Sequence, residues 1–175
     1  MHRKINGLEK EGTFSPLFLY KKMDRNLVKT LMEEALALNE ELFLIDFSIS
    51  SGGDIKVVVD GDKGVSLKEC IRISRHIEHN LDEECEFSLQ VITPDITKPL
   101  EHPRQYIKNI GRVLKVNTKE EEVEGTLVKI VNDTLFLTWK AREPKPIGKG
   151  KHTVTKQAEI AIKDIIKAIV KIVYN

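Results

Sequence analysis

The stretch Gly148-Lys-Gly-Lys151 comes nearest, in this 175-residue sequence, to a loop that binds nucleotide phosphates. A P-loop requires Gly-x-x-x-x-Gly-Lys followed by Ser or Thr, because backbone amides cradle the phosphates and the hydroxyl binds magnesium. Here His152 follows Gly150-Lys151, and Lys145 stands where the first glycine is required. We therefore interpret the stretch as part of a basic segment and not as a nucleotide site.

Two other groups of residues have types that bind metals. A calcium loop starting at Asp60 needs an acid at its fifth position and Glu at its twelfth, but Gly64 and Ile71 stand there. His76 and His79 are suitably spaced on an expected helix, yet a zinc site needs further ligands, and none follows at a persuasive spacing. The sequence also lacks the nucleophile-elbow pattern of serine hydrolases. It predicts no catalysis, no metal and no cofactor.

The strongest local concentration of charge lies in residues 140–156, where Glu143 is the only acid. The cations of this segment are Lys140, Arg142, Lys145, Lys149, Lys151 and Lys156. Since the net charge of the whole chain is only +1, any attraction to nucleic acid must come from such a local patch. The patch is suited to RNA phosphates, although charge runs also serve as solubilising loops. Two prolines and two glycines within residues 141–151 predict an irregular loop.

The composition indicates a folded, soluble protein, with 41% hydrophobic and 31% charged residues. The sequence has no run of about 18 apolar residues, so it predicts no membrane-spanning helix. Cys70 and Cys85 form no CxxC pair, so we interpret both as structural thiols of a cytoplasmic protein. Residues 1–22 show little periodicity and a helical pattern follows Met23. We therefore expect residues 1–22 to form a poorly ordered N-terminal extension.

Residues 23–98 predict the order αββαβ. The first helix begins after Asp24, which is a suitable N-cap. Two β-rich runs flank Gly52-Gly53, and Ser66 with Glu69 forms the capping-box pattern of a second helix. Phe87, Leu89 and Val91 alternate as in a strand, so we expect a two-layer α/β sandwich.

The apolar spacing also predicts which side of each helix is buried. For the first helix the predicted face is Leu27, Leu31, Ala35 and Leu38. For the second it is Leu67, Cys70, Ile71, Ser74, Ile77 and Leu81.

Residues 99–175 have a different pattern. A short helix is expected between Pro103 and Gly111, followed by strand-like runs at 112–117, 123–131 and 134–139, with Asn132-Asp133 as a two-residue turn. A further strand is expected from 152 to 162. Closely spaced short strands of this kind predict a small barrel. The tail from Ile160 to Tyr174 has strand-like composition, but the spacing of its apolar residues favours a helix.

Four pieces of sequence, in order, resemble the RimP family of ribosome maturation factors from about Met23 to the end. These pieces are Glu41–Phe47, Val57–Cys70, Phe87–Pro94, and Thr97–Leu100 followed by Ile110–Val113. The resemblance implies an α+β fold of two domains, with an N-terminal α/β domain at 23–98 and a C-terminal SH3/Sm-like barrel at 99–175. It also favours a strand over a helix in the tail, with a turn at Lys163–Lys167 and a closing strand at Ile169–Tyr174.

The function implied by the resemblance is non-catalytic. The protein is expected to be a cytoplasmic monomer that binds the immature small ribosomal subunit and helps a ribosomal protein and ribosomal RNA assemble. The alternatives are a barrel that binds free RNA and a structural adaptor unrelated to the ribosome. Binding free RNA usually needs stacked aromatic side chains, but aromatic residues are only 6% of the chain. Phe136 and Trp139 are also predicted to face opposite sides of their strand.

The sequence Val91-Ile-Thr-Pro-Asp-Ile-Thr-Lys-Pro-Leu100 is expected to connect the two domains. Pro94 ends the preceding strand, since proline cannot donate to the ladder, and Pro99 biases Lys98 toward an extended backbone. Asp95 stands where the family has glycine and Lys98 where it has arginine. The candidate contact residues of this connector are Thr93, Pro94, Asp95, Lys98 and Pro99.

Overall fold

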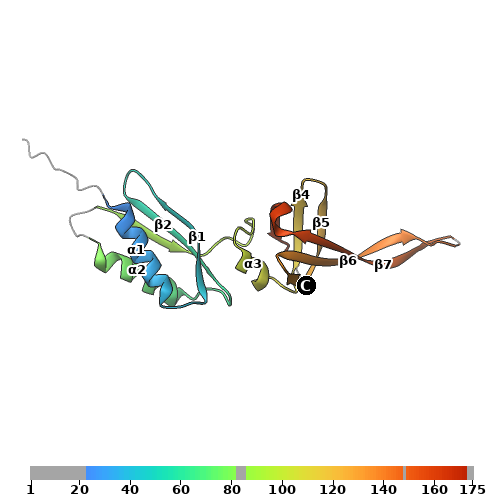
Figure 1. Cartoon of the computed structure of the whole chain (residues 1–175), viewed down its shortest axis with the longest axis horizontal. Coiled ribbons are helices and arrows are strands. Elements are labelled where there is room, and N and C mark those ends of the chain that lie inside the picture. Colours follow the sequence, from blue (N-terminus) through green and yellow to red (C-terminus); the bar gives the residue numbers. More distant parts are fainter. Residues whose placement is uncertain (1–22, 82–85, 148, 173–175) are drawn as a thin grey trace, which may run out of the picture.

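The computed structural model describes residues 23–81, 86–147 and 149–172 (Figure 1). The expectations for residues 1–22, Cys85 and the end of the closing strand therefore lie outside the described residues. The elements of the first half are α1 (Arg25–Ala37), β1 (Leu42–Ile49), β2 (Asp54–Gly61), α2 (Leu67–Asn80) and β3 (Ser88–Ile92). Those of the second half are α3 (Pro103–Lys108), β4 (Val113–Thr118), β5 (Glu122–Val131), β6 (Thr134–Pro144), β7 (Lys151–Ala161), a 3₁₀ turn η1 (Ile162–Asp164) and β8 (Ile165–Val170).

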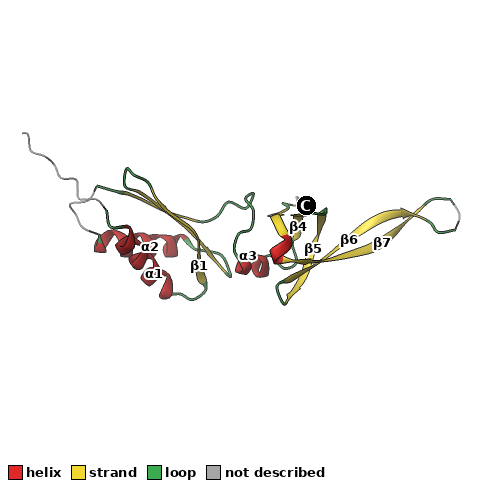
Figure 2. Ribbon diagram, turned by 45° about the horizontal axis from the view of Figure 1, so that its top comes forward, coloured by secondary structure: helices red, strands yellow, loops and turns green. Residues whose placement is uncertain are grey.

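The first half is a sheet of order β1-β2-β3 covered on one face by α1 and α2 (Figure 2). Asp24 caps α1 by accepting from the amide of Asn26 at 2.9 Å. Ser66 caps α2 by accepting from the amide of Glu69 at 3.3 Å. β1 and β2 form an antiparallel hairpin, whereas β3 lies parallel to β2 because α2 crosses between them. The expected order αββαβ is confirmed.

The predicted buried sides of the two helices are confirmed only in part. The predicted residues that are buried are Leu31, Ala35, Ile77 and Leu81. In α1, Val28 and Met32 are also fully buried, whereas the predicted Leu38 is 70% exposed. In α2, Ile73 is also buried, whereas the predicted Leu67 is 76% exposed. Each helix packs on the sheet and on the other helix. The buried side of each helix is therefore determined by its contacts with both the sheet and the other helix. It is rotated about the helix axis relative to the side that the apolar spacing predicted.

The second half is a sheet of order β7-β6-β5-β4-β8, and all of its pairs are antiparallel. Asn132 and Asp133 form the predicted turn between β5 and β6, with φ of 47° and 57°. Among the described residues no pairing joins β7 to β8, so the closed barrel that was expected is not found. The first strand of this sheet, β4, does pair with the last, β8.

The tail forms a strand and not a helix. The turn η1 precedes β8, which pairs with β4 from Leu114 to Thr118. The turn begins at Ile162, one residue earlier than predicted, and the strand begins at Ile165, four residues earlier than predicted. The helical spacing misled because isoleucine residues lie on both faces of this edge strand, including Ile166, which is 66% exposed.

The basic segment is not a long irregular loop, which corrects the prediction for residues 141–151. β6 continues to Pro144 and β7 begins at Lys151, so only the residues between them turn. β5 pairs with β6 no further than Thr138. Beyond it, β6 and β7 continue alone as a two-stranded arm that projects from the sheet (Figures 1 and 2). We call residues 139–156 the arm.

Two separate hydrophobic clusters lie beneath the two sheets. The first includes Met32, Val57 and Ile77, and the second includes Leu114, Leu127 and Leu137. None of the described helices is long and apolar enough to cross a membrane.

Candidate nucleic-acid interface and central junction

The arm has two distinct faces, which its strand register defines. Lys140 is paired with Thr155, Arg142 with Thr153, and Pro144 with Lys151. Paired residues of an antiparallel ladder point to the same side, so these side chains share one face, and all of them are exposed. The intervening pairs, Trp139 with Lys156, Ala141 with Val154 and Glu143 with His152, share the other face.

Lys156 forms an ion pair with an acidic residue on the same face of the arm. Its ammonium lies 2.6 Å from the carboxylate of Glu143. The hydrogen bond from Lys156 lowers the pKa of Glu143, so the pair remains ionised at neutral pH. This cation is therefore already partnered, unlike Lys140, Arg142 and Lys151, for which no ion pair is found with any described residue.

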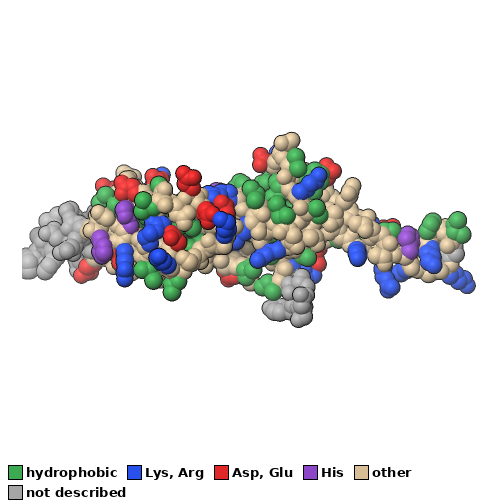
Figure 3. Space-filling model, turned by 90° about the horizontal axis from the view of Figure 1, so that it is seen from below, with side chains coloured by type: hydrophobic (Ala, Val, Ile, Leu, Met, Phe, Trp, Pro, Cys, Tyr) green, Lys and Arg blue, Asp and Glu red, His purple; other side chains and the backbone are tan. Residues whose placement is uncertain are grey.

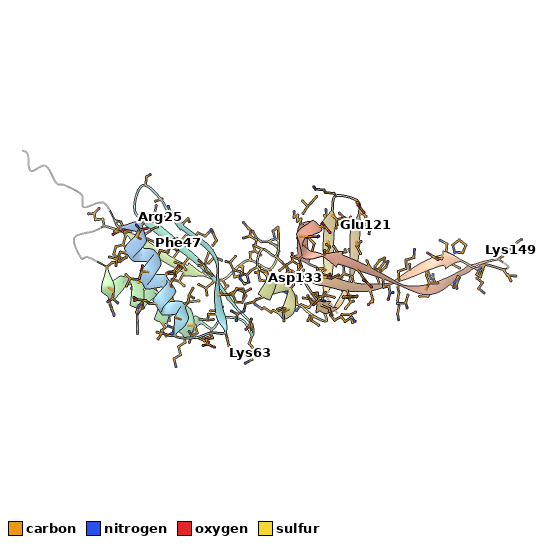
Figure 4. The ribbon with its side chains drawn as sticks, in the orientation of Figure 1. Arg25, Phe47, Lys63, Glu121, Asp133 and Lys149 are labelled. Atoms are coloured by element: carbon orange, nitrogen blue, oxygen red, sulfur yellow. The ribbon has the colours of Figure 1, made fainter. Side chains whose placement is uncertain are left out.

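Lys145 and Lys149 belong to the turn at the tip of the arm. The amide of Lys145 donates to the carbonyl of Gly150 at 3.0 Å and closes the turn. Figure 4 places Lys149 at the far end of the arm. The predicted cations thus fall into three groups: Lys140, Arg142 and Lys151 on one face, Lys156 on the other, and Lys145 and Lys149 at the tip.

The surface of the arm contrasts with the rest of the molecule. In Figure 3, Lys and Arg side chains project from the arm with almost no acidic side chains between them. Over the first half, the same view shows acidic and basic side chains intermixed. The cations that are clustered in the sequence are therefore also clustered on the surface of the arm.

The connector residues line a pocket of about 220 Å³ between the two halves. The predicted contact residues all contribute to it, namely Thr93, Pro94, Asp95, Lys98 and Pro99. Asp95 accepts hydrogen bonds from the amide and the hydroxyl of Thr97, both at 2.8 Å. The backbone hydrogen bond from Thr97 lowers the pKa of Asp95. The aspartate at the family's glycine position thus stabilises a local turn.

The short helix α3 holds the first half through Arg104. Its guanidinium donates to the carboxylate of Asp62, with Nε to Oδ1 at 2.9 Å, and to the backbone carbonyl of Glu40 at 2.8 Å. The same group lies 4.6 Å from the centre of the Phe43 ring, and His102 stacks on that ring. The hydrogen bond from Arg104 lowers the pKa of Asp62.

A second contact of α3 is buried. Asp60 is only 4% exposed and accepts from the ammonium of Lys108 at 2.6 Å and from the amide of Gln105 at 3.2 Å. The backbone amide of Gly61 donates to it at 2.8 Å. A buried carboxylate is stable only when it is paired and hydrogen-bonded in this way. On its opposite side α3 contributes Tyr106 to the second hydrophobic cluster, so it connects both halves.

This junction was not predicted. Asp60 and Asp62 stood out in the sequence only as imperfect calcium ligands, and their partners Arg104 and Lys108 lie 42 and 48 residues away. The available signal was a pair of acids at the end of an apolar strand. Side chains two residues apart along an extended chain point to the same side, so both acids can contact α3.

The described residues contain no group of three or more potential metal ligands. His76 instead lies 3.3 Å from the carboxylate of Glu34. Burial raises the pKa of Cys70, so this thiol is a poor nucleophile.

Comparison with known proteins connects this arrangement with a family. The family model described as the RimP N-terminal domain matches residues 30–96. The chain is 48% identical to the ribosome maturation factor RimP of Christiangramia forsetii, over 87% of this chain and 100% of that protein. The proteins of the same name from Flavobacterium psychrophilum and Porphyromonas gingivalis are 45% and 31% identical, each over 84% of this chain and covering 96% and 97% of the relative. The chain therefore belongs to the RimP family of ribosome maturation factors.

Proposed function

We propose that this protein is a non-catalytic ribosome maturation factor that binds the immature small ribosomal subunit. The observation that carries the proposal is the 48% identity to a RimP ribosome maturation factor along that relative's full length. Its partners would be ribosomal RNA and a ribosomal protein, and it would act in the cytoplasm as a monomer without a cofactor.

The division of the structure into two parts supports a two-sided binding protein. We propose that residues 23–98 and 99–175 are two domains, because each sheet has its own hydrophobic cluster. We also propose that the second is of the SH3/Sm-like type. The pairing of its first strand β4 with its last strand β8 brings together the beginning and the end of this half, as in a small barrel.

The arm would supply the contact with RNA in this role. Its exposed cations are concentrated in a segment that projects away from both hydrophobic clusters, so they are available to a partner. Phosphates attract such a patch strongly at low salt and weakly at high salt. The connector would position the two domains, and Thr93, Pro94, Asp95, Lys98 and Pro99 would lie close to the bound particle.

Sedimentation of the tagged protein through a sucrose gradient tests the proposal. We expect it to migrate with free small subunits and not with assembled ribosomes. Exchange of Arg142 and Lys151, which lie on the same face of the arm, for glutamate should weaken this association and reduce its dependence on salt. A protein that stays at the top of the gradient in cells accumulating immature subunits would contradict the proposal.

The aromatic side chains do not favour the alternative of a barrel that binds free RNA. Trp139 packs against the second hydrophobic cluster, whereas Phe136 points to the other side and receives Lys129 at 4.5 Å from its ring centre. The two rings thus face opposite sides, as predicted, and offer no shared platform on which successive bases could stack.

A further inference from the structure

We infer that the arm binds RNA with one face only, through a strip formed by Lys140, Arg142 and Lys151 with Thr153 and Thr155. Its ligand would be the sugar-phosphate backbone, contacted without regard to base sequence. This inference rests on the proposed function and assigns its RNA contact to particular side chains. It also excludes half of the cations that the sequence suggested.

The strand register places the three cations on one side of the arm. Lys140, Arg142 and Pro144 alternate along β6 and therefore project to one side, and Lys151 is paired with Pro144 on that side. With about 3.4 Å per residue along an antiparallel strand, two residues span about 7 Å. The three cations therefore form a line about 14 Å long, with similar steps between them.

The neighbours of these cations fit a polyanion. Thr155 and Thr153 are paired with Lys140 and Arg142 and are exposed, so their hydroxyls can donate to phosphate or sugar oxygens. The guanidinium of Arg142 can bind a phosphate through two parallel hydrogen bonds. The strip contains no acid that would repel the ligand.

The composition of the strip also argues against a folded protein as its ligand. Arg142 is of a type that is common among the anchors of protein interfaces, but such anchors are buried in well-packed pockets and are accompanied by Trp or Tyr. The strip has no aromatic side chain and no large aliphatic one. It also lacks the rings on which bases stack, so the backbone is the part of RNA that it can contact.

The opposite face lacks these properties. Ala141 and Val154 form its centre, and its cation Lys156 is paired with Glu143. Trp139 packs toward the second hydrophobic cluster. A phosphate approaching this side would meet an apolar surface and an ion pair that it would have to break.

Two triple variants that remove equal charge from the same arm test the inference. The strip variant carries Lys140→Gln, Arg142→Gln and Lys151→Gln, and the matched control carries Lys145→Gln, Lys149→Gln and Lys156→Gln. All six side chains are exposed, so both variants should fold, which circular dichroism and thermal melting would verify. Binding to transcribed small-subunit ribosomal RNA is measured by filter retention between about 50 and 200 mM salt.

We expect the strip variant to lose most of the affinity. Each phosphate contact contributes about 0.7–0.9 to the slope of log K against log salt, so the slope should fall by about 2–3. The control should change the slope by less than about 1, because Lys156 is already paired with Glu143 and Lys145 and Lys149 lie beyond the end of the strip, in the turn at the tip.

Three outcomes would overturn the inference. Equal losses in both variants would show that the arm attracts RNA as a diffuse charge, while the proposed function would stand. Unchanged RNA binding by the strip variant, together with loss of co-sedimentation with small subunits, would assign the strip to a protein. If the unmodified protein does not associate with small subunits, the proposed function itself fails. Sedimentation of the unmodified protein alone shows this outcome, without either variant.

Discussion

Asp60 shows how a single carboxylate can control the junction between the two halves. It is almost completely buried, and it accepts hydrogen bonds from one charged and two neutral donors. An ionised carboxylate in such a place is strongly destabilising without a counter-charge. The ammonium of Lys108 is therefore more important to stability than the surface lysines of the chain.

Exchange of Lys108 for methionine tests this role while keeping most of the apolar stem. We expect the free energy of unfolding to fall by about 2–3 kcal/mol, because Asp60 would remain buried without its counter-charge. The side chain of Lys108 is 28% exposed, which keeps the loss below that of a fully buried pair. Urea denaturation measures the change.

The matched control is Lys171→Met. Lys171 pairs with Glu124, but their side chains are 50% and 47% exposed, and such pairs contribute at most about 1 kcal/mol. Equal destabilisation by the two variants would contradict the special role of the buried pair.

The pair of Asp62 and Arg104 predicts a dependence on pH. The hydrogen bond from Arg104 lowers the pKa of Asp62 in the folded protein. The pair therefore stabilises the junction at neutral pH, and this contribution is lost as the pH falls below about 4. In an NMR titration, the Nε–H signal of Arg104 should move as Asp62 becomes protonated, and Asp62→Asn should abolish that transition. A signal that does not move between about pH 6 and pH 2 would show that the pair has no such role.

At the scale of elements, α3 is the piece that joins the two halves. It places Arg104, Gln105 and Lys108 against the end of the first sheet and Tyr106 in the second hydrophobic cluster. The prolines of the connector restrict only the backbone on either side of residues 95–98. We therefore assign the larger part of the orientation to α3.

Two double variants separate these contributions. Pro94→Gly with Pro99→Gly should leave both halves folded and loosen their orientation slightly. Arg104→Ala with Lys108→Ala should loosen it more, because all charged contacts of α3 with Asp60 and Asp62 are lost. Small-angle scattering would show a larger increase in radius of gyration for the second variant. A larger increase for the proline variant would reverse the assignment.

The elements themselves were largely predictable from local sequence. Caps at Asp24 and Ser66 and the turn at Asn132-Asp133 act over a few residues, so their signals are complete within the sequence. The arm was mistaken for a loop because proline was taken to exclude strand structure. Pro144 is tolerated there since it lies at the end of β6, where no partner on its outer side needs an amide.

At the scale of the whole molecule, the arm projects from a body that does not need it for stability. None of the described residues between Lys140 and Lys156 belongs to either hydrophobic cluster as a buried member. A two-stranded ribbon contributes little stability of its own. The arm should therefore be removable without unfolding the rest.

Deletion of residues 142–153 with a two-residue Asn-Gly turn in their place tests this separation. We expect the melting temperature to change by no more than a few degrees, since little buried apolar area is lost. Binding to small-subunit ribosomal RNA should fall at least about tenfold at low salt, because most of the arm's cations are removed. Loss of the folded state would show that the arm is part of the core structure.

The arrangement of the whole was less predictable than its parts. The two sheets follow from strand patterns, but the contacts of Asp60 and Asp62 with α3 depend on how the halves meet, which no local pattern encodes. The strand register of the arm divides its cations between two faces. A count of charges in the sequence does not reveal on which face each cation lies. Closure of the second sheet was expected both from the closely spaced short strands and from the resemblance, and it is not found among the described residues.

The position of the arm has a consequence for how the protein approaches a partner. Residues 140–156 carry six cations and one acid, whereas the whole chain has a net charge of +1, so the remaining residues are net negative. Among the described residues, this positive charge lies at one end of an elongated structure (Figure 1), so the described part of the chain has a large electric dipole moment. Near a polyanion it would turn so that the arm leads, and this electrostatic steering would make the association rate, as well as the affinity, fall steeply with ionic strength.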